Sequence, residues 1–72
     1  MVTDKLTEKL YLSPNIISNW SNELGLKIPK DSNLEDQKLF INLFEKIKVL
    51  KENKFDFNEI KIVLHSEIQK YN

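Results

Sequence analysis

The stretch that decides the fold is residues 6–26, LTEKLYLSPNIISNWSNELGL. It opens with Leu6 and Leu10, which are four residues apart and therefore share one face of a helix. Thr3 can cap this helix, and a negative charge in its first turn suits the helix dipole. The pattern predicts a short helix over about residues 4–10.

Signals for the start of a second helix follow directly after the first predicted helix. Ser13 is a good N-cap, and Pro14 occupies the first helical position, where its missing N–H costs nothing. Gly25 is the residue expected in a left-handed helix stop. These signals predict a helix over 14–24 whose inward face is formed by Ile17, Trp20 and Leu24, with Trp20 as a core residue.

Composition limits the class of protein. The 72 residues fit one domain, and 40% hydrophobic with 31% charged residues is typical of a globular chain. There is no cysteine and a single histidine, His65, and no nucleophile–base pair or phosphate-cradling glycine loop is present. We therefore expect no enzyme, no metal, no cofactor and no small-molecule ligand.

Charge and hydropathy indicate where in the cell the protein lies and which partners it could bind. Positive and negative residues balance to a net charge of zero, which argues against a polybasic nucleic-acid binder but not against a local basic patch. No apolar run approaches the roughly 20 residues of a membrane span, and charges interrupt the N-terminus where a signal peptide would be apolar. The sequence thus predicts a cytoplasmic protein.

The segment 27–35 leaves two alternatives open. It could be a small two-stranded hairpin with Ile28 and Leu34 pointing inward. It could equally be a loop that leads to a helix capped by Ser32, with Glu35 completing a capping box.

Two further helices are predicted. Apolar residues at helical spacing indicate one over about 37–53, closed by Asn53 or Lys54, of which Asn tolerates the left-handed conformation better. Asp56 and Glu59 have capping-box spacing, and Phe55 and Ile60 have hydrophobic-staple spacing. They open a last helix over about 57–71, in which Ile68 and Tyr71 are expected to lie beyond the domain's own core.

The first two predicted helices have the spacing of a helix-turn-helix, in which the second helix enters the DNA major groove. Thr7 takes the small-residue position where the helices touch, but the turn position usually held by Gly is Tyr11. A Tyr at positive φ costs on the order of 1 kcal/mol.

Beyond this motif, residues 3–64 resemble the DNA-binding domain of the MerR superfamily. The matching stretches are LTEKLYLSPNIISNWSNELGL, IP at 28–29 and LFEKIKVLKENKFDFNEIKIVL at 43–64. The resemblance implies a mainly α winged helix-turn-helix of four helices with a short or degenerate wing. It is greatest to the divergent branch that holds RacA-type chromosome-anchoring proteins and plasmid segregation regulators. The wing here is acidic, at Glu35 and Asp36, and Ser18 and Asn19 stand where such domains usually carry two Arg.

The predicted DNA-facing residues come from both helices and the segment after them. Asn can bond an adenine edge with two hydrogen bonds, Ser can bond base or phosphate, and a helix N-terminus suits a phosphate. Lys side chains are candidate backbone contacts. The candidates are Ser13, Asn15, Ile16, Ser18, Asn19 and Asn22 on the second helix, Lys27 and Lys30 after it, and Lys5 and Lys9 on the first.

Two hypotheses follow. The first is a sequence-specific module for double-stranded DNA in a bacterial, plasmid or phage protein, acting in transcription regulation or DNA segregation and associated with nucleoid or plasmid. It would be the N-terminal part of a longer protein that forms a homodimer through sequence beyond residue 72. The alternative is a protein-interaction domain that kept this fold and lost DNA binding, favoured by the lack of Arg and the zero net charge.

Overall fold

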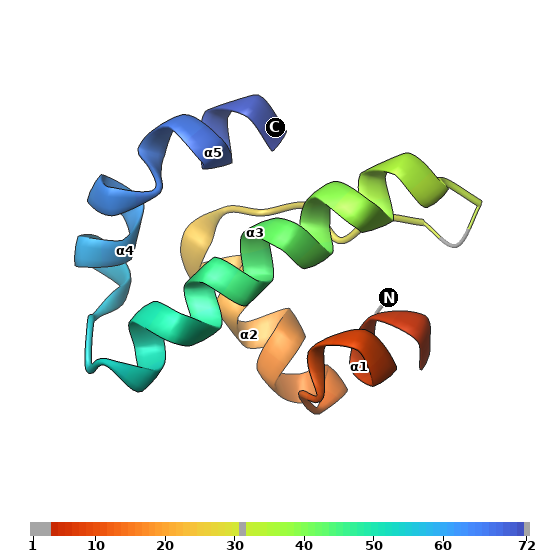
Figure 1. Ribbon diagram of the computed structural model, residues 1–72, viewed down its shortest axis with the longest axis horizontal. Helices are drawn as coiled ribbons and strands as arrows, with labels where there is room; N and C mark the ends of the chain where they lie inside the picture. Colours follow the sequence, from red (N-terminus) through yellow and green to blue (C-terminus); the bar gives the residue numbers. More distant parts are fainter. Residues whose placement is uncertain (1–3, 31, 72) are drawn as a thin grey trace.

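The computed structural model describes residues 4–30 and 32–71, and over these the chain is mainly α-helical, as the sequence predicts. Five helices and no strand occur in this part of the chain (Figure 1). In chain order they are α1 (Asp4–Leu10), α2 (Pro14–Leu24), α3 (Leu34–Glu52), α4 (Phe57–Val63) and α5 (His65–Tyr71).

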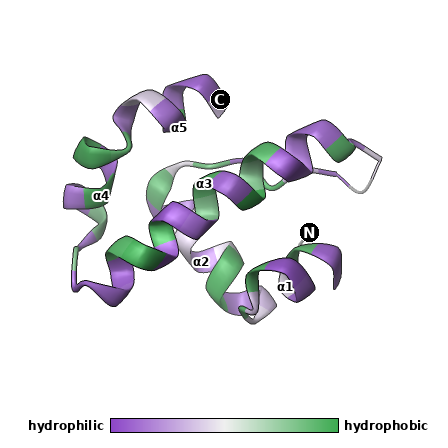
Figure 2. Cartoon of the chain, in the orientation of Figure 1, coloured by the Kyte–Doolittle hydropathy of each residue, from purple (hydrophilic) through white to green (hydrophobic). Residues whose placement is uncertain are grey.

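The long helix α3 is the centre of the arrangement. It contacts α1 near one face and α5 near another, while α4 contacts both α2 and α5 (Figure 1). Hydrophobic and hydrophilic residues alternate along α3, as expected of a helix that is buried on one side (Figure 2). Every other helix therefore packs on α3 or on a neighbour of α3.

The core combines residues from all five helices. Phe40 and Phe44 of α3 are fully buried and stack with their ring centroids 5.0 Å apart. Around them lie the other buried apolar side chains, which are Leu6, Leu10, Ile17, Leu24, Leu26, Leu43, Ile47, Ile60, Leu64 and Ile68. A domain this small depends on such a core being continuous.

The first two helices begin and end where the sequence predicts. The Ser13 side chain accepts a hydrogen bond from the Ile16 N–H at 3.3 Å, and Gly25 takes the left-handed conformation at φ 69°. The predicted cap at Thr3 lies outside the described residues. Local signals thus predict the limits of both helices.

The turn between α1 and α2 keeps its left-handed residue although that residue is not Gly. Tyr11 has φ 55°, and its N–H donates to the Thr7 carbonyl at 2.9 Å. Its side chain is 87% exposed, so tertiary packing does not oppose this backbone conformation. The intrinsic cost of a left-handed Tyr remains.

The segment after α2 is a loop, and the hairpin alternative is wrong for its described residues. Leu34, expected to point inward, is 57% exposed and already belongs to α3. The helix cap is Asn33 and not Ser32, because the Asn33 side chain both accepts from the Asp36 N–H and donates to the Asp36 carboxylate. As a result α3 begins three residues earlier than residue 37.

The end of α3 corrects a second expectation. Asn53 has φ −90°, and the left-handed residue is Lys54, at φ 66°. The Asn53 side chain donates to the Val49 carbonyl at 2.7 Å, so it closes the last turn and leaves the reversal to the next residue. The predicted capping box follows and is confirmed, with Asp56 bonded to the Glu59 N–H and Glu59 bonded back to the Asp56 N–H.

The predicted single helix over 57–71 is wrong, because it breaks at Leu64 into α4 and α5. The count is therefore five helices and not four within the described ranges. The break turns α5 back over α3, so Ile68 is buried and the Tyr71 ring lies 5.7 Å from the Phe40 ring. The expectation that Ile68 and Tyr71 lie beyond the core is wrong for the same reason.

Candidate nucleic-acid interface

The buried face of α2 decides which of its side chains reach solvent. Ile17, Ser21 and Leu24 are buried, whereas Trp20 is half-buried at the edge of this face. Ser21 is 1% exposed, and its hydroxyl oxygen has no hydrogen-bond partner among the described residues. Sequence reasoning missed Ser21, although it lies four residues after Ile17 and three before Leu24, on the same helical face.

Trp20 is a packing residue, although it is less buried than the prediction of a core residue implied. Its ring stacks on Phe44 at 5.8 Å between centroids and meets Phe57 edge-on at 6.5 Å. Lys51 covers the outer side, with its Nζ 5.9 Å from the Trp20 ring and 4.3 Å from the Phe57 ring. The indole is thus enclosed by α3 and α4 and is not a platform for stacking bases.

The opposite face of α2 carries the predicted candidates and is open. Ser13, Asn15, Asn19 and Asn22 are exposed, and Ile16 is 38% exposed. Ser18 differs, because it is half-buried. Three amides at positions 15, 19 and 22 share one side of the helix, and no acidic residue lies in its first turn.

The end of α1, just before α2, is bonded to α3 by a contact that the sequence did not reveal. Lys48 Nζ donates to the Leu10 carbonyl, the last residue of α1, at 2.7 Å, and it lies 6.0 Å from the Tyr11 ring. A cation is favoured at a helix C-terminus, so this bond fixes the turn that leads into α2. Lys48 therefore has a structural role, unlike a lysine whose side chain only contacts solvent.

The four candidate lysines are all exposed but form two groups. Lys27 and Lys30 lie on the loop after α2 and line one cavity. Lys5 and Lys9 lie four residues apart on α1, and Lys9 lines a different hollow with Tyr11 and Glu45. Residues 1–30 carry four Lys against three acidic residues, so the positive field on this side is small.

Two other side chains hold the loop that carries the first lysine pair. Gln37 is 4% exposed, and its Nε2 donates to the Lys30 carbonyl at 3.0 Å. The Tyr71 hydroxyl donates to the Lys27 carbonyl. Burial, together with the negative charge of Asp36, raises the pKa of Tyr71 to about 12, so the phenol keeps its proton at neutral pH.

Other kinds of site find little support within the described ranges. No group of three metal-ligating side chains is placed to hold an ion there, and none of the helices is long and apolar enough to cross a membrane. Comparisons with protein-family models, with curated proteins and with solved structures found no match to this chain. The site is therefore interpreted from its own geometry.

Proposed function

We propose that this chain is a sequence-specific binding domain for double-stranded DNA, with α2 as the helix that enters the major groove. The observation that carries the proposal is the polar, outward face of α2, which follows a tight turn and a Ser–Pro helix start. An 11-residue helix of about 10–12 Å diameter fits a groove about 12 Å wide. This proposal includes the MerR-like winged helix-turn-helix class, with the loop after α2 in place of a wing.

Base recognition would come from the first half of α2. Asn15 and Asn19 are exposed amides, and an amide can form two hydrogen bonds with an adenine edge. Ile16 offers an apolar contact of the kind that reads a thymine methyl group. Ser18 is half-buried, so its hydroxyl would act nearer to the edge of the interface.

Phosphate contacts would come from Ser13 and the four exposed lysines, Lys5, Lys9, Lys27 and Lys30. Such contacts set the position of a protein on the duplex without reading sequence. Since the positive field is small, one domain should bind weakly at physiological salt. A homodimer would raise the affinity, and it fits a role in transcription regulation or DNA segregation.

The experiment is a selection from random duplex DNA at low salt, followed by fluorescence-anisotropy titration of the selected site. The test variant is the triple change Asn15→Ala, Ser18→Ala and Asn19→Ala, and the matched control is Asn58→Ala, an exposed amide on α4. The proposal expects an enriched sequence whose binding is lost in the test variant only. No enrichment, or equal binding by both variants, would contradict it.

A second candidate function is a protein-interaction domain, and one observation favours it. Five apolar side chains on α3 and α4 are more than half exposed, which are Leu34, Leu39, Val49, Ile62 and Val63. Ile62 and Val63 are adjacent on α4, and contiguous exposed apolar residues mark interaction surfaces. Under the DNA-binding proposal, replacing Ile62 and Val63 by Asp should leave DNA binding unchanged. If that variant still binds DNA but loses its function in the cell, the protein-interaction proposal is favoured.

A further inference from the structure

The loop that carries Lys27 and Lys30 is bonded at both ends by side chains, one from α5 and one from the following helix α3. We call residues 27–30 the lysine segment. Tyr71 of α5 donates its hydroxyl hydrogen to the Lys27 carbonyl, 44 positions away in sequence. Gln37 of α3 donates its amide to the Lys30 carbonyl at 3.0 Å. The two bonds bracket the segment at its first and last residue.

Apolar contacts alone would hold this segment less firmly. Pro29 is buried and Ile28 is half-buried, so the middle of the segment is anchored to the core. On the side of Tyr71, however, a cavity of about 450 Å³ lies against the segment, and Lys27 and Lys30 line it. The segment has no strand partner among the described residues, and the Lys30 carbonyl accepts one backbone bond, from the Asn33 N–H at 3.1 Å. The Tyr71 and Gln37 side chains supply the further bonds to its carbonyls.

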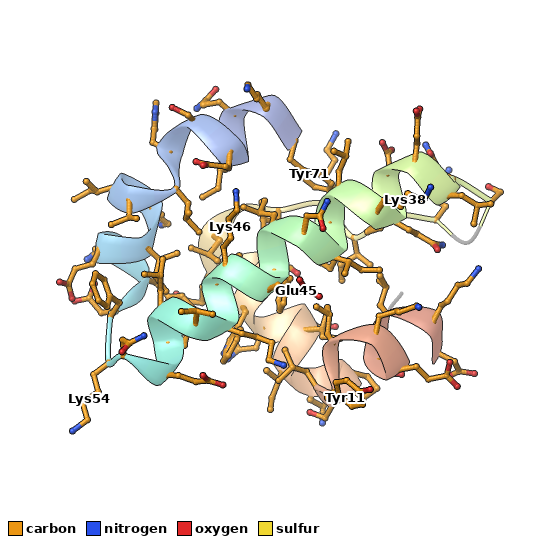
Figure 3. The ribbon with its side chains drawn as sticks, in the orientation of Figure 1. Tyr11, Lys38, Glu45, Lys46, Lys54 and Tyr71 are labelled. Carbon is orange, nitrogen blue, oxygen red and sulfur yellow. The ribbon has the colours of Figure 1, made fainter. Side chains whose placement is uncertain are left out.

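The two donors are themselves well placed. The Tyr71 ring packs 5.7 Å from the Phe40 ring, and Figure 3 shows Tyr71 reaching from the end of α5 toward α3. Gln37 is 4% exposed, so water competes little for its amide. A buried donor costs free energy when its bond is lost, which applies to Gln37, whereas Tyr71 is half-buried and is oriented by its ring contact with Phe40.

We propose that Tyr71 and Gln37 are positioning residues that hold the backbone of the lysine segment so that Lys27 and Lys30 meet DNA phosphates in a fixed geometry. The inference rests on the proposed DNA-binding function and adds a role for α5 to it. Ordering a loop before binding removes an entropic cost that binding would otherwise have to offset. Neither residue touches DNA in this account; each acts through the lysine it holds.

The test is a double-mutant cycle on the 72-residue chain, with anisotropy titration on the DNA site selected by the unaltered chain. Tyr71→Phe removes the hydroxyl and keeps the ring, and Gln37→Leu removes the amide and keeps the bulk. Each should weaken DNA binding about 3- to 10-fold. In a Lys27→Gln, Lys30→Gln background the same changes should have no effect on affinity. Gln69→Leu, on the exposed face of α5, is the matched control.

A second readout needs no DNA. Amide hydrogen exchange of the lysine segment should speed up in Tyr71→Phe and Gln37→Leu, while exchange in α2 stays unchanged. Equal losses of affinity with and without the lysines would overturn the positioning role, as would unchanged exchange in the segment. If the unaltered chain enriches no DNA, the proposed function fails and the positioning role falls with it. That outcome differs from binding that is present but insensitive to Tyr71 and Gln37.

Discussion

Helix α2 and the lysine segment are neighbours in the chain, yet they acquire their structure in opposite ways. Within α2, each boundary has a cause inside or next to the helix, from the Ser13 cap to the left-handed Gly25. The lysine segment has one local backbone bond, from the Asn33 N–H to the Lys30 carbonyl at 3.1 Å, and Tyr71 and Gln37 hold its backbone from α5 and α3. Two parts of one candidate interface can therefore differ in how far their local sequence predicts their structure. They can also differ in whether local or distant substitutions change that structure.

The largest expected effect comes from the core of the domain, on which α2 packs. Phe44→Ala should cost about 3–5 kcal/mol of the free energy of unfolding, which is most of the stability of a domain this size. Phe44 is fully buried and stacks on both Trp20 and Phe40, so its loss undermines α2 and α3 together. Chemical denaturation followed by circular dichroism measures this cost. Leu39→Ala, at a half-exposed position of α3, is the control and should cost far less.

The half-buried Trp20 provides a comparison with the fully buried Phe44, again through the free energy of unfolding. Trp20→Ala should cost less than Phe44→Ala, because solvent already reaches part of the indole. If Trp20→Ala proved the more destabilising of the two, the packing described for α2 on α3 would be wrong.

The next effect separates base reading from folding. Asn19→Ala should cost about 1–3 kcal/mol of specific DNA binding and leave the free energy of unfolding unchanged, since the amide is exposed. Titration with the selected and a scrambled duplex, beside a thermal melt, measures both quantities. An equal loss on the two duplexes would mean that Asn19 reads no base.

The lysine segment should respond differently from α2. Lys27→Gln and Lys30→Gln should each weaken binding to all sequences alike and reduce the slope of affinity against salt by about one unit. Measurement of the dissociation constant over a series of salt concentrations tests this. A loss of affinity confined to the selected sequence would mean that these lysines contact bases. The lysine segment would then not differ from α2 in the part of the DNA that it contacts.

These two regions also show what the sequence could and could not predict. The limits of α1 and α2 and the Asp56–Glu59 capping box follow from residues within a turn of each boundary. The break at Leu64 does not, because no Pro or Gly marks it and its cause lies in the burial of Ile68 and Tyr71 against α3. The same long-range packing explains why Gln37 and Lys48 had no recognisable role in the sequence.

A small effect is expected at the turn before α2. Tyr11→Gly should raise the free energy of unfolding by up to about 1 kcal/mol, because Gly adopts φ 55° without the steric cost that Tyr has. The entropy of Gly in the unfolded chain offsets part of this gain. A thermal melt measures the difference. A clear loss of stability would mean that the exposed Tyr11 ring makes a contact worth more than the backbone strain.

The smallest effect concerns pH. The folded-state pKa of Tyr71 is raised to about 12 from 10.0, so the protonated phenol is favoured in the folded chain. Its contribution to stability is full below pH 10 and is lost as pH rises from 10 to 12. Denaturation at a series of alkaline pH values should therefore show a steeper loss for the unaltered chain than for Tyr71→Phe. Equal slopes would contradict the burial of the Tyr71 phenol in the folded chain.

The most direct test of the central claim is the ratio of the dissociation constants for a scrambled and a selected duplex. For the unaltered chain and for Asn58→Ala, the account predicts a ratio well above one. For the triple variant of Asn15, Ser18 and Asn19, it predicts a ratio near one with residual, salt-dependent binding through the lysines. A ratio that stays high in the triple variant would contradict the claim that α2 reads the DNA sequence.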